Sequence, residues 1–94
     1  MTFYSLAEKV AEEFKSMMQD EGFETFSEMV RCYQWDTEDI KDEVDFILKD
    51  IGEDCYIDEE DRNYVYLHGC ESIPYSKFSR MFRKHLKDMI ESED

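Results

Sequence analysis

The chain has 94 residues, of which 25 are acidic and 11 basic, and its formal net charge at pH 7 is −14. This length predicts one domain with one core, spanning residues 1–94. Hydrophobic residues make up 41% and aromatic residues 15% of the chain, which is too much for a disordered protein. The strong negative charge excludes the usual electrostatic binding of nucleic acid, because that binding needs a basic surface.

Targeting and redox features favour the cytoplasm. The N-terminus carries no signal segment, and no apolar run approaches the length that spans a membrane. The cysteines Cys32, Cys55 and Cys70 are odd in number and widely spaced, unlike those of a secreted disulfide framework. We therefore expect a cytoplasmic protein with reduced thiols.

Three helices are predicted in the first half of the chain. Apolar residues recur at helical spacing over residues 3–17, and the pattern stops at Gly22. Thr25 and Glu28 match a T-x-x-E capping box, which opens a short second helix. A third helix follows and ends at Gly52, a residue suited to the left-handed C-cap. Its inward side chains are expected to be Ile40, Val44, Ile47, Leu48 and Ile51.

A hairpin and a last helix are predicted in the second half. Residues 55–57 and 64–68 have the character of two short strands around a polar loop. Pro74 and Ser76 then open a C-terminal amphipathic helix, and residues 88–94 are expected to form a frayed acidic tail. The predicted class is therefore α+β and mostly helical, with three helices, a short β-hairpin and a final helix.

This order is similar to a winged-helix domain. Residues 25–52 resemble a helix-turn-helix, and residues 56–67 stand where a wing would be. The resemblance implies that the helix after Asp36 would enter the major groove and the hairpin would touch the DNA backbone. Both segments are rich in carboxylates, which DNA phosphates repel, so we expect no direct DNA binding.

The segment 36–45, DTEDIKDEVD, holds six carboxylates and one lysine. Glu38–Asp42 and Asp39–Glu43 are like-charged pairs one turn apart, each destabilising a helix by about 0.2–0.5 kcal/mol. The helix dipole accounts for acids in the first turn only. With the apolar face turned inward, we expect the later carboxylates to face water without partners, so that reversing their charge would leave stability equal or higher.

Charge spacing suggests a use for these carboxylates. At about 1.5 Å per residue, the segment carries one net negative charge per ~3 Å, near the ~3.4 Å spacing along a DNA strand. Together with the acidic loop before the second strand, it could form one surface that occupies the basic groove of a nucleic-acid-binding protein. The candidate contact residues are Glu38, Asp39, Asp42, Glu43, Asp45, Asp58, Glu59, Glu60 and Asp61.

In overall character the chain resembles the small acidic inhibitors of phages and mobile elements, including DNA mimics and some anti-CRISPR proteins. The resemblance implies a basic partner, such as a nuclease or an effector complex, in the cytoplasm of a bacterial host. The alternative is a cytosolic structural or accessory interaction module, self-associating or not, whose acidity serves solubility only. A homodimer stays open on either hypothesis.

Residues 75–87 are an exception to the acidity, with five bases and no acid. Three roles stay open for this segment: it offsets neighbouring carboxylates, binds RNA or a membrane surface, or shares an apolar face with a second copy. Trp35 has two interpretations as well, as a lid on the core or as an anchor for a partner.

Catalytic and metal-binding motifs are weak. An EF-hand starting at Asp58 would place Asn63 at the glycine position, and no C-x-x-C pair supports a zinc site formed with His68. No glycine-rich phosphate loop or sheltered carboxylate pair is visible. We therefore expect no enzyme, no cofactor and no metal.

Overall fold

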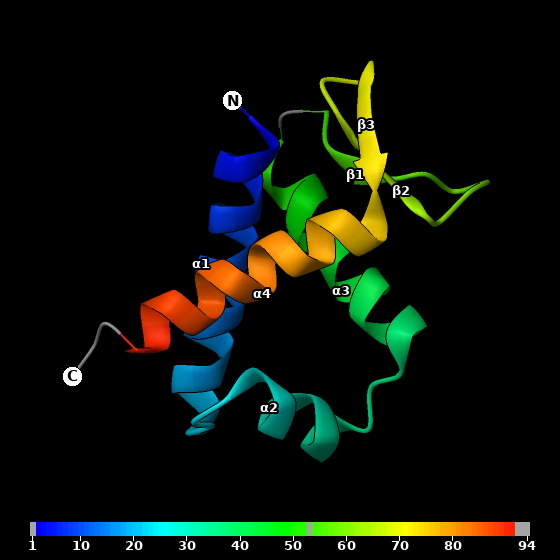
Figure 1. The fold of residues 1–94 in the computed structure, drawn as a ribbon. Helices are drawn as coiled ribbons and strands as arrows, with labels where there is room; N and C mark the ends of the chain where they lie inside the picture. The colour runs from blue at the N-terminus through cyan, green and yellow to red at the C-terminus, as the bar shows by residue number, and fades with distance from the viewer. Residues whose placement is uncertain (1, 53, 92–94) are drawn as a thin grey trace.

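The computed structural model describes residues 2–52 and 54–91, which form four helices and three strands (Figure 1). Their order is α1 (Phe3–Glu21), α2 (Phe26–Tyr33), α3 (Thr37–Ile51), β1 (Tyr56–Ile57), β2 (Tyr64–Leu67), β3 (Glu71–Pro74) and α4 (Tyr75–Glu91). The predicted α+β, mostly helical class is confirmed. Residues 88–91 of the expected tail belong to α4, and residues 92–94 lie outside the described residues.

Local capping chemistry fixes where the helices begin. Thr25 Oγ1 accepts the amide of Glu28 at 3.0 Å, but the Glu28 carboxylate accepts the amide of Glu24 and not that of Thr25. The capping box predicted there is therefore only half formed. A complete box opens α3, where Asp36 and Asp39 each accept the other's amide, at 2.8 and 3.1 Å.

The core lies where α4 crosses α1, and α2 closes one end of it (Figure 1). The ring of Phe14 on α1 lies 5.0 Å from that of Phe26 on α2 and 5.4 Å from that of Phe82 on α4, between centroids. Val44 and Leu48 of α3 are fully buried beside them, as expected, while Val30 packs against the core half-buried. The α3 helix therefore faces inward as its stripe predicted.

The predicted hairpin is part of a three-stranded antiparallel sheet in the order β1-β2-β3. The third strand was missed because its sequence, ESIP, has a single apolar residue other than its proline, the half-buried Ile73. The turn between β2 and β3 was missed too. His68 and Gly69 both have positive φ, 57° and 73°, where an Asn-Gly pair would have been the usual signal.

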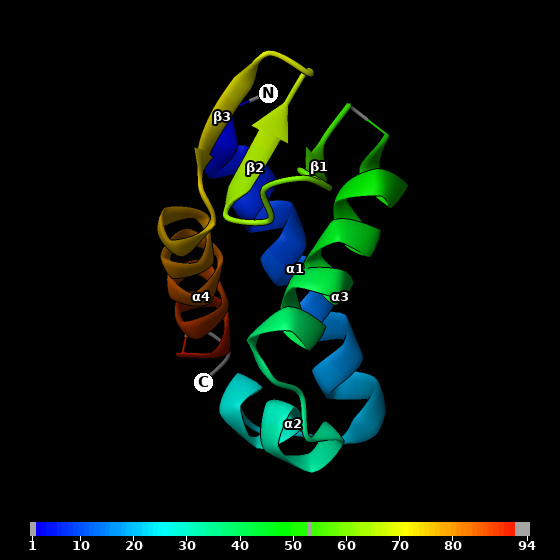
Figure 2. The same cartoon turned by 90° about the vertical axis from the view of Figure 1, so that its right-hand side faces the viewer.

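Helix packing departs from a helix-turn-helix. In the described residues α2 and α3 each pack on α1 and make little contact with one another. A helix-turn-helix needs its two helices packed together, so the winged-helix resemblance remains one of sequence pattern. Figure 2 shows instead that α3 and α4 stand apart on either side, with α1 behind them.

Candidate protein-binding surface

Arg62, in the loop between β1 and β2, binds the acidic side of α3. Its Nε donates to Glu38 Oε2 at 2.8 Å, and its Nη2 donates to Asp42 Oδ1 at 2.6 Å. The hydrogen bond to Asp42 is the largest cause that raises the pKa of the Arg62 guanidinium above its ordinary value. The expectation that Glu38 and Asp42 face water unpaired is therefore wrong, because Arg62, 24 and 20 positions further along the chain, lies between them.

Asp45 has a structural role in the same region. Its Oδ1 accepts the backbone amide of Ile57 at 2.9 Å, and its Oδ2 lies 3.0 Å from Lys49 Nζ. The hydrogen bond to Asp45 raises the pKa of Lys49, and the charge of Glu59 adds to the effect. Asp45, with a side chain 19% exposed, thus joins α3 to β1 and is no freely solvated acid.

The remaining candidate carboxylates divide into two groups. Asp39 serves the cap of α3, while Asp58 accepts the amide of Glu60 and Asp61 accepts that of Asn63, both within the loop. Three others have side chains that make no hydrogen bond or ion pair within residues 2–52 and 54–91, namely Glu43, Glu59 and Glu60. We call these three the outer acids.

The two acidic segments of the sequence thus form one surface. Arg62 holds the loop against the first half of α3, and Glu59 influences Lys49 near its second half. We call this region the acidic surface. Its residues are Glu38, Asp39, Asp42, Glu43, Asp45, Asp58, Glu59, Glu60 and Asp61.

Phe46 is the residue of this region that sequence reasoning missed. It follows Asp45 directly, falls off the buried stripe of α3, and is 71% exposed. On a helix, Asp42, Glu43 and Asp50 lie one turn from it, as does Lys49, so three of its four neighbours on the helix surface are carboxylates. The available signal was its position between Val44 and Ile47, where helical spacing leaves a large apolar residue facing away from the core.

Trp35 and the three cysteines have ordinary surroundings. Trp35 is half-buried, packs against the core, and stacks on Tyr33 with ring centroids 5.1 Å apart. Cys55 is buried, whereas Cys32 and Cys70 are exposed. Within the described ranges, no group of three His, Cys, Asp or Glu side chains is arranged to hold a metal ion.

Comparisons of the chain with protein-family models, curated proteins and solved structures found no match. Among residues 2–52 and 54–91, no helix has both the length and the apolar character needed to cross a bilayer.

Proposed function

We propose that this protein is an interaction module that binds a basic partner through its acidic surface, with Phe46 as the apolar anchor. The single observation that carries the proposal is the exposure of Phe46, at 71%, among carboxylates. Acidity that served solubility alone would gain nothing from an exposed phenylalanine at that place. Interfaces, in contrast, combine a central aromatic anchor with a polar rim.

The charge of the surface sets the chemistry of the partner. Nine carboxylates belong to it, and within the described residues Lys41, Lys49 and Arg62 are the cations paired with them. Glu38 and Asp42 keep 58% and 66% of their side chains exposed even while they bind Arg62. A basic surface is therefore the complementary partner, and such complementarity mainly accelerates encounter and selects the partner.

We further propose that the partner handles nucleic acid, whose binding groove the acidic surface would occupy. The support is the spacing of net charge along α3, near that of a phosphate backbone. Arg62 also supports the proposal, because this residue fixes the loop to the helix and so keeps the charges in one arrangement before binding. Preorganisation of this kind lowers the entropic cost of association.

Affinity capture from a host lysate at low salt, with the tagged protein as bait, tests the proposal. Three baits are compared with the parent: Phe46→Ala, reversal of the outer acids to lysine, and reversal of Glu12, Glu13 and Asp20 on α1. The last triple has the same change in net charge on exposed residues away from the surface. We expect the parent and the α1 bait to capture a basic nucleic-acid-handling protein that salt releases. The Phe46→Ala bait and the outer-acid bait should fail to capture it.

Two results would contradict the proposal. Equal capture by all four baits would mean that neither Phe46 nor the outer acids contact the partner. Selective capture of a protein without a nucleic-acid-binding surface would leave the interaction module standing and overturn its nucleic-acid-mimic part.

A further inference from the structure

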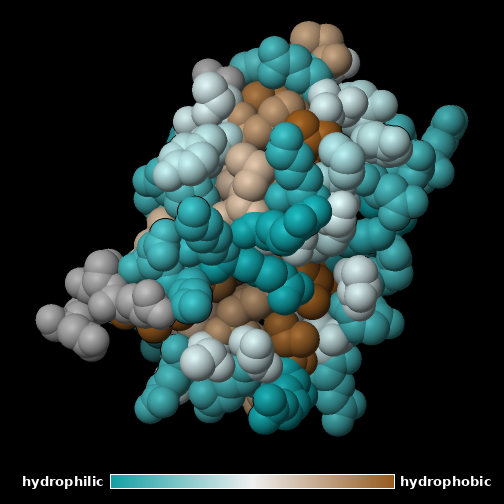
Figure 3. Space-filling model, viewed as in Figure 1, coloured by the Kyte–Doolittle hydropathy of each residue, from teal (hydrophilic) through white to brown (hydrophobic). Residues whose placement is uncertain are grey.

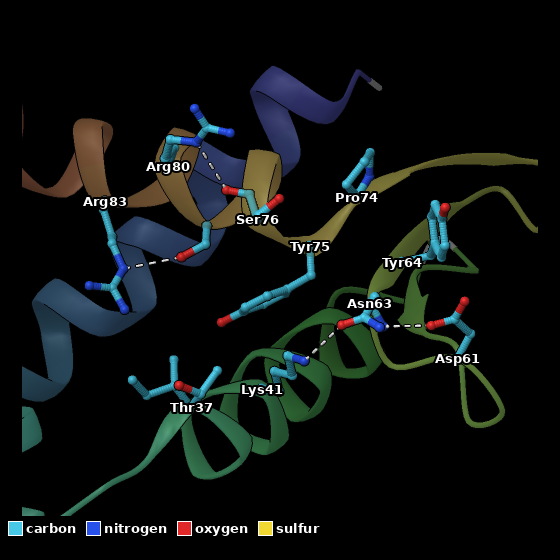
Figure 4. Close-up of a pocket in the computed structure, with 12 residues that line it drawn as sticks. Thr37, Lys41, Asp61, Asn63, Tyr64, Pro74, Tyr75, Ser76, Arg80 and Arg83 are labelled. Atoms are coloured by element: carbon cyan, nitrogen blue, oxygen red, sulfur yellow. Dashed lines mark hydrogen bonds between the residues drawn. The ribbon is translucent and has the colours of Figure 1, made fainter.

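A hollow of about 720 Å³ lies between α3 and α4, below the start of β2 (Figure 4). Thr37, Ile40 and Lys41 of α3 form one wall, and the first turns of α4 form the other. Figure 4 shows the ring of Tyr75 lying between the two helices. The hollow exists because α3 and α4 both pack on α1 but scarcely on each other.

Two further hollows continue this one along α4, and Arg83 lines all three. The second, of about 470 Å³, lies beside α2 and the linker to α3, and includes Trp35. The third, of about 360 Å³, lies between the start of α2 and the later turns of α4, up to Ile90. We call the three together the basic groove.

The charge of the groove is opposite to that of the chain. Five of the eleven bases line it, Arg31, Lys41, Arg80, Arg83 and Lys87, against two acids, Asp36 and Asp61. The whole chain has more than twice as many acids as bases. The bases of α4 are therefore not spread evenly over an acidic body, but gather along one hollow.

The two arginines of α4 are oriented by their own helix. Arg83 Nε donates to Ser79 Oγ at 3.1 Å, and its guanidinium lies 5.2 Å from the ring centroid of Phe26. Arg80 Nε donates to the carbonyl oxygen of Ser76 at 3.4 Å. Within the described residues, neither arginine uses its terminal Nη atoms in a hydrogen bond or ion pair, so these donors are available to a carboxylate.

We propose that the basic groove binds an acidic peptide segment of another protein, with carboxylates along the arginines and an apolar side chain at the far end. Phe26, Leu86 and Ile90 line that end. Figure 3, seen from the same side as Figure 1, shows hydrophobic surface beneath α4, next to the hydrophilic band over the helix. From Tyr75 to Ile90 the helix covers about 22 Å, which an extended peptide of about seven residues would match.

The negative field of the chain favours a peptide over single-stranded nucleic acid. Proteins that bind single strands stack bases on open aromatic faces. In the groove, Lys41 Nζ lies 5.1 Å from the ring centroid of Tyr75 and Arg83 lies over Phe26, and these two aromatic residues are only 7% and 9% exposed, while Trp35 is half-buried and Tyr64 is 40% exposed. A polyphosphate chain would also meet the field of a chain with net charge −14, whereas a peptide places its few acids only where the cations are.

Fluorescence anisotropy with a labelled peptide tests the proposal. The probe is a peptide of about seven residues, four glutamates followed by Leu-Phe-Leu, and its reference has glutamine in place of glutamate. We expect the glutamate probe to bind at low salt at least about tenfold more tightly than its reference. Arg83→Glu should weaken it about tenfold or more, because an arginine–carboxylate contact becomes a repulsion.

Lys77→Glu is the matched control. It makes the same change in net charge on the same helix, but Lys77 is exposed and lies outside the groove lining. It should change the affinity less than about threefold, since screening weakens distant charges. Arg83→Gln, which keeps part of the packing on Phe26, serves as the second variant should the charge reversal lower the melting temperature.

Three results would overturn the inference: equal binding of the two peptides, equal loss with Lys77→Glu and Arg83→Glu, or tighter binding of a labelled oligothymidylate of equal length than of the glutamate probe. The inference does not depend on the proposed function. Reversal of the outer acids should leave the glutamate probe bound, so failure of the acidic surface and failure of the groove are distinguishable.

Discussion

The acidic surface and the basic groove lie on neighbouring sides of α3, and their charges are handled in opposite ways. On the acidic surface, Arg62 is bound by two carboxylates that keep much of their exposure, and Lys49 is bound by the largely buried Asp45. In the groove, Arg80 and Arg83 are held by a backbone carbonyl and a serine hydroxyl, so their positive ends stay available. The first arrangement stiffens a surface of excess charge, and the second preserves donors for a ligand.

A run of like charge in the sequence therefore does not say which of its charges are paired inside the fold. Glu38 and Arg62 are 24 positions apart, and only the fold brings them together. Two carboxylates on either side of one guanidinium lose most of their mutual repulsion, because each is nearer to the cation than to the other acid. The destabilisation expected from helix spacing alone for the like-charged pair Glu38–Asp42 is thereby removed.

The largest effect is expected from the core that supports both regions. Leu48 is fully buried on α3, so Leu48→Ala should cost about 2–5 kcal/mol of unfolding free energy, through lost burial and a cavity. Urea denaturation followed by circular dichroism measures it. Phe46→Ala, two residues earlier on the solvent side, is the control and should change stability by no more than about 0.5 kcal/mol. An equal cost at both positions would mean that α3 is rotated from the orientation described.

A smaller effect separates the structural acids from the outer acids. The triple reversal Glu38→Lys, Asp42→Lys and Asp45→Lys should lower stability by about 1–3 kcal/mol. It replaces two partners of Arg62 by like charges and leaves the amide of Ile57 without its acceptor. Thermal unfolding at low and high salt measures the loss, which salt should reduce in part.

The outer acids provide the matched comparison for this triple. Reversing Glu43, Glu59 and Glu60 changes the net charge equally but breaks no hydrogen bond or ion pair of the described chain. Stability should stay within about 0.5 kcal/mol of the parent. Should the two triples destabilise alike, net charge would govern the stability and not the contacts of Arg62.

The helices and the core face of α3 were predictable because both depend on local signals. Helical spacing gave Ile40, Val44 and Leu48 their inward direction, and glycine at 52 marked the end of the helix with φ 79°. The strand β3 was not predictable in this way. It is ordered by pairing with β2, while its own side chains are mostly exposed.

The carboxylates of the candidate surface were visible in the sequence, but their contacts and the exposed Phe46 among them were not. The sequence places Asp45 on the solvent side of α3, yet the structure makes it an acceptor for Ile57 on β1. The groove was harder still to foresee, because its bases come from α2, α3 and α4. From the sequence, only the basic character of residues 75–87 was visible. Whether these bases line a groove depends on the packing of α3 and α4, which stand apart in the fold.

The last effect concerns Tyr75, whose ring lies in the groove between α3 and α4. Its ring lies under Lys41 of α3, and the side chain of Ser79 of α4 influences the pKa of its phenol. Burial raises the pKa of the Tyr75 phenol above 10.0, while Arg83 and Ser79 act in the other direction. The unfolded chain therefore ionises first as the pH rises. The contribution of this phenol to stability is complete below pH 10 and is lost as the pH rises through the folded-state pKa.

Tyr75→Phe isolates this contribution. The variant should be less stable than the parent by up to about 1 kcal/mol near neutral pH, because it loses the polar interaction of the phenol with Ser79. Between about pH 9 and pH 11 the parent should lose more stability than the variant, so the gap between them narrows. Tyr33, whose pKa is also raised by burial, titrates in both proteins and drops out of the difference. Urea unfolding at about pH 9 and about pH 11 measures the difference in stability between parent and variant. A difference that stays constant would mean that the phenol is solvated and that α3 and α4 are not linked through Tyr75.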